Sequence, residues 1–160
     1  MYTPAALLDL HERAHRSLRK LIAHCGQLDQ EGLNRDLDGF GFPSVRLQLH
    51  HVIGAEEYWM GVLRGRFEVD ENDGAYPTVE TLEAYRSAVC ETTDRYLAAA
   101  STDELNTARS MTTWGNKERV LVPAHVFLRT STHIYHHQGQ IVAMCRLLGK
   151  PAEGMDFPIV

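Results

Sequence analysis

Two histidines on one predicted helix, His133 and His137, have the spacing of a metal-binding pair. Residues four positions apart lie one turn apart on the same face of a helix, with their Cβ atoms about 5–6 Å apart. Two imidazoles at that separation can share one ion at zinc–nitrogen distances of about 2.0–2.1 Å. Both lie on an apolar seam that should face the core, where an imidazole needs a partner to offset the cost of its burial. The pair therefore predicts one divalent metal ion.

A third ligand is expected from a second helix, on which His50 and His51 are adjacent. His51 shares an apolar stripe with Leu47 and Ala55, whereas His50 falls on a more polar face with Glu57. The spacing thus selects His51 over His50. Three histidines leave at least one coordination position open, which is the pattern of a catalytic zinc rather than a closed structural one. Zinc is the expected ion, with nickel, iron and manganese as alternatives.

The other histidines are given different roles. His11 lies on the stripe of the first predicted helix, and we interpret it as a satisfied core residue or as an outer partner of a metal ligand, with a fourth ligand as the alternative. His15 and His24 are expected on a solvated face. His136 lies about 60° off the seam of its helix and should be more exposed than its neighbours, and His125 should lie at the rim.

Four long helices must position these residues, and their ends are marked by capping residues. Helices are predicted over residues 4–26, 44–65, 78–100 and 123–148. Their N-terminal signals are Thr3, Ser44, Thr78 and Pro123, and their C-terminal signals are Gly26, expected in the left-handed conformation, Gly65 and Gly149. Ser101 and Glu104 have capping-box spacing, so a short extra turn is expected there. A small β-hairpin is predicted over 107–122, and a solvated loop over 66–77.

The bulk composition fits one domain over residues 1–160, an all-α four-helix bundle with long crossover loops. The net charge of −5 excludes a basic nucleic-acid-binding face, and no apolar run is long enough to span a membrane. Cys25, Cys90 and Cys145 form no CxxC motif, and the N-terminus lacks the layout of a signal peptide. A reduced, cytoplasmic protein is expected. We also expect a small-molecule substrate and a homodimer.

Two segments resemble the DinB/YfiT-like family of metalloproteins. Residues 44–60, SVRLQLHHVIGAEEYWM, resemble the family's second helix, in which a metal-binding histidine precedes an apolar turn and an acidic–aromatic pair. Residues 133–141, HIYHHQGQI, resemble its HxxxH motif followed by a Gly-Gln pair, and Gly149 before Lys-Pro resembles its usual helix end. The resemblance implies a four-helix bundle with unusual connections and the ligands His51, His133 and His137. Gln138 stands where many members have a basic residue, a difference expected to affect the rim or a dimer contact.

The resemblance implies less about the reaction. Characterised relatives include thiol-dependent transferases that use bacillithiol or mycothiol, and a mycothiol-dependent maleylpyruvate isomerase. We therefore interpret the chain as a metal-dependent enzyme of the thiol S-transferase type, with a low-molecular-weight thiol as cosubstrate. A metal-dependent hydrolase and a non-catalytic metal-binding or dimerising helical module are the alternatives, and no residue is assigned to catalysis.

Overall fold

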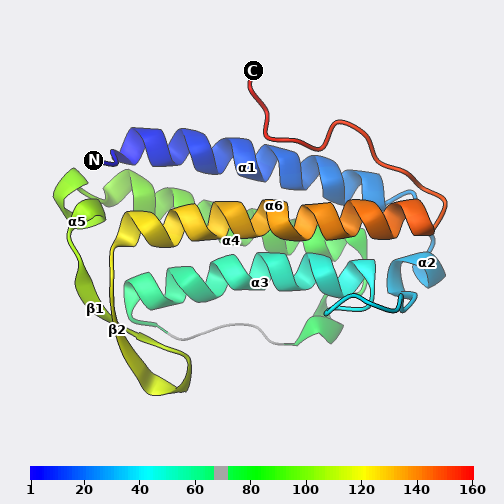
Figure 1. The fold of residues 1–160 in the computed structure, drawn as a ribbon, viewed down its shortest axis with the longest axis horizontal. Helices are drawn as coiled ribbons and strands as arrows, with labels where there is room; N and C mark the ends of the chain where they lie inside the picture. Colours follow the sequence, from blue (N-terminus) through cyan, green and yellow to red (C-terminus); the bar gives the residue numbers. More distant parts are fainter. Residues whose placement is uncertain (67–71) are drawn as a thin grey trace.

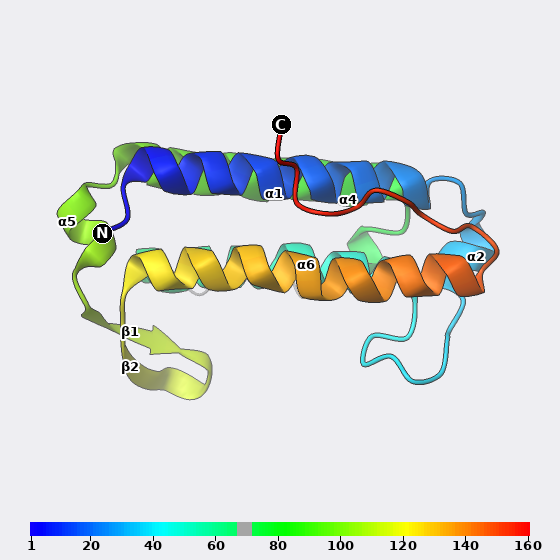
Figure 2. The same cartoon turned by 45° about the horizontal axis from the view of Figure 1, so that its top comes forward.

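The computed structural model describes residues 1–66 and 72–160. Four long helices form a bundle with nearly parallel axes: α1 (Pro4–Cys25), α3 (Val45–Arg64), α4 (Val79–Ala99) and α6 (Pro123–Leu147) (Figure 1). In the turned view α1 and α4 form one layer, and α3 and α6 form the other (Figure 2). The all-α bundle and its small hairpin are confirmed.

The order of the helices around the bundle is not up-and-down. Each long helix packs against two others, in the pairs α1–α4, α4–α3, α3–α6 and α6–α1. α3 and α4 both start at the end of the bundle where α2 lies, and therefore run parallel to each other (Figure 1). α1 and α6 run the opposite way. This connectivity places α3 beside α6, the two helices that carry the predicted metal ligands.

The short elements lie at the two ends of the bundle. α2 (Gln30–Asn34) and the 3-10 turn η1 (Asp73–Ala75) lie near the start of α3, and α5 (Thr102–Asn106) follows α4. The hairpin joins β1 (Arg109–Thr113) to antiparallel β2 (Lys117–Leu121) through η2 (Trp114–Asn116), with Arg109 opposite Leu121. The prediction of a loop over 66–77 falls partly on residues 67–71, which lie outside the described residues.

The predicted caps set most of the helix boundaries. Side chains of Thr3, Ser44 and Ser101 each accept a hydrogen bond from the backbone amide three residues later. Thr78 forms a reciprocal capping box with Thr81. Gly65 ends α3 as predicted and adopts the left-handed conformation, with φ 66°. Gly26 does not, because α1 ends in a right-handed turn with φ −63° that leads on toward α2.

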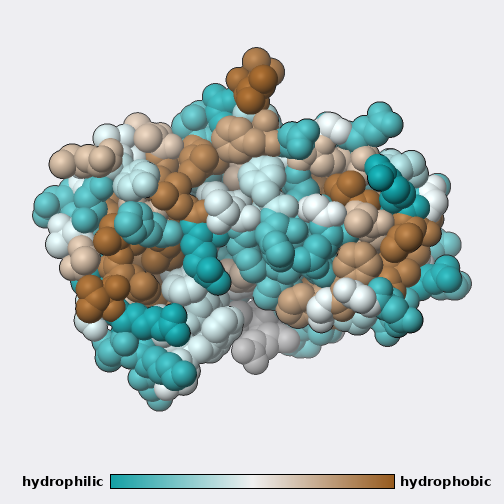
Figure 3. All heavy atoms as spheres, viewed as in Figure 1, coloured by the Kyte–Doolittle hydropathy of each residue, from teal (hydrophilic) through white to brown (hydrophobic). Residues whose placement is uncertain are grey.

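The core divides along the bundle into two apolar clusters. The first holds buried residues of α1, α3, α4 and α6, among them Leu18, Leu49, Leu82 and Ile141. The second lies toward α5 and the hairpin, and includes Leu7, Tyr58, Leu97 and Phe127. Figure 3 shows hydrophilic residues over much of the middle of the viewed face, with hydrophobic residues toward both ends of the bundle and at the C-terminus. No helix in the described ranges is long and apolar enough to cross a membrane.

Candidate metal centre

Three histidine side chains meet between α3 and α6. His51 comes from α3, and His133 and His137 come from successive turns of α6. Their available nitrogen atoms all lie within 4.8 Å of one another. The ring centroids are 5.2 Å apart for His51 and His133, 4.7 Å for His51 and His137, and 4.4 Å for His133 and His137. The structure thus brings together the three residues that the sequence singled out.

The spacing of the nitrogen atoms fits a tetrahedral ion. The Nε2 atoms of His51 and His133 are 3.2 Å apart. Two nitrogen ligands at about 2.0–2.1 Å from one zinc ion, at a tetrahedral angle, would be about 3.3 Å apart. Without an ion, the two nitrogen atoms can form one hydrogen bond, in which one donates its proton and the other accepts it. The arrangement therefore suits a cation between the rings without a large movement of either helix.

Gln48 on α3 fixes the orientation of His137. Its Oε1 lies 2.6 Å from His137 Nδ1, and its Nε2 donates to the Phe42 carbonyl at 3.1 Å and to Gln140 Oε1 at 2.9 Å. Because the amide nitrogen donates to two oxygens, its oxygen must face the imidazole and accept the Nδ1 proton. His137 is then the tautomer with a free lone pair on Nε2. Outer hydrogen bonds of this kind orient metal-bound histidines.

An aromatic ring from the segment before α3 holds His51. The ring of Phe42 stacks on His51 with a centroid distance of 3.9 Å and an interplanar angle of 21°, and it approaches His137 edge-on at 6.3 Å. The same residue accepts the Gln48 hydrogen bond through its carbonyl. Phe42 therefore shields one side of the histidine cluster from water and restricts rotation of His51.

All three imidazoles are held neutral by their surroundings. Burial and the nearby His51 lower the pKa of His133 to about 4, and burial with the neighbouring His133 lowers the pKa of His137 to about 3. Burial and His50 lower the pKa of His51 as well. A neutral imidazole has the lone pair that a metal ion requires, so the cluster is ready to bind an ion at neutral pH.

His50, His125 and His136 lie outside the three-histidine cluster, as predicted. The predicted apolar stripes of α3 and α6, however, need correction. His136 and His125 are exposed, and His50 packs beside Tyr76 and Tyr85 rather than beside the cluster. His51 is half-buried at the edge of the α3 core face instead of at its centre, because Gln48 and Val52 are the residues that point inward. The apolar seam of α6 that holds His133 and His137 was predicted to continue to Leu147, but this residue is 68% exposed.

A second polar cluster lies inside the bundle, centred on Glu56 of α3. One Glu56 oxygen lies 2.8 Å from His11 Nε2 and the other 2.7 Å from His15 Nε2, while Thr93 donates to Glu56 at 2.6 Å. His11 Nδ1 also lies 2.8 Å from Asp94. His11 is therefore a satisfied core histidine. His15 is buried, which corrects the expectation of a solvated face, because α1 packs on α4 as well as α6.

Hydrogen bonding argues against a metal ion in this second cluster. His11, His15 and Cys90 are close enough to hold one. Yet both nitrogens of His11 face carboxylates and so act as donors. Arg86 lies 3.1 Å from His15 Nδ1 and can only donate, which leaves the proton of His15 on Nε2, toward Glu56. Neither ring keeps a lone pair for an ion, and the cluster is a buried charge network.

The sequence reasoning missed Gln48, Phe42 and Glu56. The change at Gln138 was expected to affect the rim or a dimer contact, but this side chain is buried and accepts a hydrogen bond from the Ser17 hydroxyl at 3.2 Å. The sequence held one signal for Gln48 and Glu56, namely that both are polar residues on an apolar helix face. They lie two turns apart on α3 among buried residues. A buried amide or carboxylate calls for partners, and here those partners are histidines.

The fold and the site together define a helical-bundle protein with a candidate three-histidine metal centre. The family model described as the DinB family matches residues 1–160, and the chain belongs to this family. No curated protein matches the chain.

Proposed function

We propose that this DinB family protein is a metal-dependent enzyme that binds one divalent ion through His51, His133 and His137 and uses a low-molecular-weight thiol as cosubstrate. The observation that carries the proposal is the meeting of three neutral imidazoles at ligand distances between α3 and α6. Zinc is the ion we expect. The thiol rests on the resemblance of residues 44–60 and 133–141 to a family that includes thiol-dependent transferases.

A bound ion with an open position would supply one chemical effect, lowering the pKa of a coordinated thiol or water. The protein's own residues would supply the rest. Gln48 keeps the His137 lone pair on Nε2, and Phe42 limits water on one side of the ligands. Three ligands from only two helices leave the remaining side of the ion for a small molecule.

Metal content in single variants tests the site directly. Stoichiometric zinc should be found by elemental analysis and titration in wild type, and should be lost or greatly weakened in His51→Ala, His133→Ala and His137→Ala. His136→Ala is the matched control, since this exposed histidine lies on the same helix and outside the cluster. Retention of the ion by both α6 variants would overturn the metal site.

An activity assay tests the proposal that the protein is an enzyme. The protein should accelerate the reaction of a low-molecular-weight thiol with an aryl halide, and this acceleration should be lost on chelation and restored by zinc. A protein that binds zinc at the cluster but accelerates no reaction with any thiol tried would favour the non-catalytic metal-binding module. Ester or amide hydrolysis without thiol, lost on chelation, would favour the hydrolase.

A further inference from the structure

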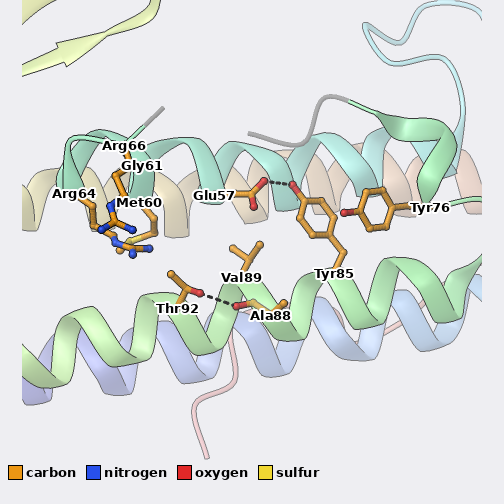
Figure 4. A pocket seen from close by; sticks show the side chains of 10 residues that line it. All are labelled: Glu57, Met60, Gly61, Arg64, Arg66, Tyr76, Tyr85, Ala88, Val89 and Thr92. Atoms are coloured by element: carbon orange, nitrogen blue, oxygen red, sulfur yellow. Dashed lines mark hydrogen bonds between the residues drawn. The ribbon is translucent and has the colours of Figure 1, made fainter. Parts of the chain in front are cut away.

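A cavity of about 370 Å³ lies between α3 and α4, away from the histidine cluster. Figure 4 shows its walls: Met60 of α3 lies at one end with Arg64 and Arg66, Val89 of α4 lies in the middle, and Tyr76 and Tyr85 lie at the other end. Its volume falls within the range of small-molecule sites, about 300–1,000 Å³. Nothing in the metal proposal uses this cavity.

The arginine end has the chemistry of an anion site. The guanidinium groups of Arg64 and Arg66 lie close together in Figure 4, and both side chains line the cavity. Neither forms an ion pair with any residue in the described ranges. Two adjacent cations on a chain of net charge −5 are stabilised when an anion lies between them, and guanidinium groups bind carboxylate and phosphate oxygens in a paired geometry.

The middle of the cavity and its end opposite the arginines indicate the chemistry of the rest of the ligand. Met60 and Val89 offer apolar contacts, so the anion should carry an apolar body. Glu57 lines the cavity seven residues before Arg64, which is about 10 Å along the same face of α3. Glu57 accepts a hydrogen bond from Tyr85 at 2.6 Å, and Tyr85 stacks on Tyr76 at 4.4 Å. A carboxylate here repels a second anion and can accept from a neutral donor.

The cavity and the candidate metal centre lie on different sides of α3. His51 faces α6, whereas the cavity lies between α3 and α4. Met60 is nine residues from His51, about half a turn around the helix axis after whole turns are removed. A molecule in the cavity therefore has no direct contact with an ion at the histidines.

We propose that this cavity binds a small organic monoanion, a carboxylate joined to an apolar body about 10 Å long with a neutral hydrogen-bond donor at its far end. Arg64 and Arg66 hold the carboxylate, Met60 and Val89 contact the apolar body, and Glu57 accepts from the donor.

Three matched compounds test this ligand class by amide NMR titration of the full chain. The probe para-hydroxyphenylacetate should bind saturably and shift signals of residues 57–66 and 85–92. Tyrosol lacks the negative charge, and para-phenylenediacetate carries a second one, so each should bind at least about fivefold more weakly. Chelation of metal should leave the titration unchanged, which separates this proposal from the metal centre.

Exposed arginines allow a clean set of variants. Arg64→Gln and Arg66→Gln should each weaken binding of para-hydroxyphenylacetate about fivefold or more and leave the weak binding of tyrosol unchanged. Arg119→Gln, an exposed arginine on β2, removes the same charge elsewhere and should have no effect. Absence of saturable binding, wild-type affinity for para-hydroxyphenylacetate in the Arg64→Gln and Arg66→Gln variants, or signal shifts confined to the histidine cluster would overturn the proposal.

Discussion

Gln48 shows how one side chain can orient a candidate metal ligand from outside the histidine cluster. Its buried amide accepts the Nδ1 proton of His137 and is itself held by Phe42 and Gln140. Outer partners of metal-bound histidines typically contribute about 10–100-fold to metal affinity. The candidate centre therefore includes residues from the segment before α3 as well as the two ligand helices.

Replacement of Gln48 should weaken the metal site without dismantling the fold. In Gln48→Leu, His137 loses the acceptor that fixes its tautomer, and zinc affinity should fall at least about tenfold. Gln138→Leu is the control, because this buried amide bonds Ser17 and not a ligand histidine. Competition titration with a chromophoric chelator measures both. Equal zinc affinity in wild type and Gln48→Leu would show that the hydrogen bond has no role.

At the scale of elements, Glu56 ties three helices together. It accepts from His11 and His15 of α1 and from Thr93 of α4, and it lies on α3. Burial alone would raise the pKa of Glu56, but His15 and His11 hold it well below its usual range. Burial likewise opposes charge on His11, yet Glu56 and Asp94 raise its pKa. The lowered pKa of Glu56 and the raised pKa of His11 both favour an ion pair between these two side chains inside the bundle.

Loss of the Glu56 carboxylate should destabilise the bundle more than loss of any single partner. Glu56→Leu strands charged and donor groups in the core, and should lower the free energy of unfolding by about 3–5 kcal/mol. Thr93→Val removes one hydrogen bond and should cost about 1 kcal/mol. Urea unfolding monitored by circular dichroism compares the two. A smaller effect for Glu56→Leu than for Thr93→Val would contradict this role.

Most helix boundaries and the spacing of the two candidate ligands on α6 follow from local rules, whereas the buried network around Glu56 does not. Thr3, Ser44 and Thr78 cap helices because their side chains reach backbone amides three residues on, which the sequence states directly. The spacing of His133 and His137 is equally local. The burial of His15 could not be predicted, because α1 packs against both α4 and α6. Which residues of α1 face α4 depends on the packing of the whole bundle and not on the sequence of α1 alone.

At the scale of the whole molecule, the bundle should fold without an ion. Two apolar clusters run along its length and bury residues from every long helix. The apo-protein should therefore keep its helical signal and a cooperative thermal transition, at a melting temperature below that of the zinc-loaded form. Circular dichroism with and without chelator measures this. Unfolding at room temperature after chelation would indicate a structural ion instead.

The metal-free protein should lose stability on acidification through the histidines of the centre. The pKa values of His133 and His137 are about 4 and about 3 in the folded chain, below the usual value of about 6.5. Between pH 6.5 and 4 the unfolded chain binds protons on these residues that the folded chain does not, so stability falls as pH falls. The double variant His133→Ala, His137→Ala should show a shallower fall over this window. An identical pH dependence would argue against it.

The ligands are far apart along the chain, and this governs when an ion can act during folding. His51 and His133 are separated by 82 positions, so the site exists only after α3 and α6 have docked. We expect this long-range docking to follow the folding transition state, and an ion that recognises a contact made after that state does not accelerate folding. Zinc should therefore leave the refolding rate nearly unchanged and slow unfolding, which stopped-flow experiments in urea would measure. The ion would bind only after the bundle has formed, and it would lengthen the lifetime of the folded chain.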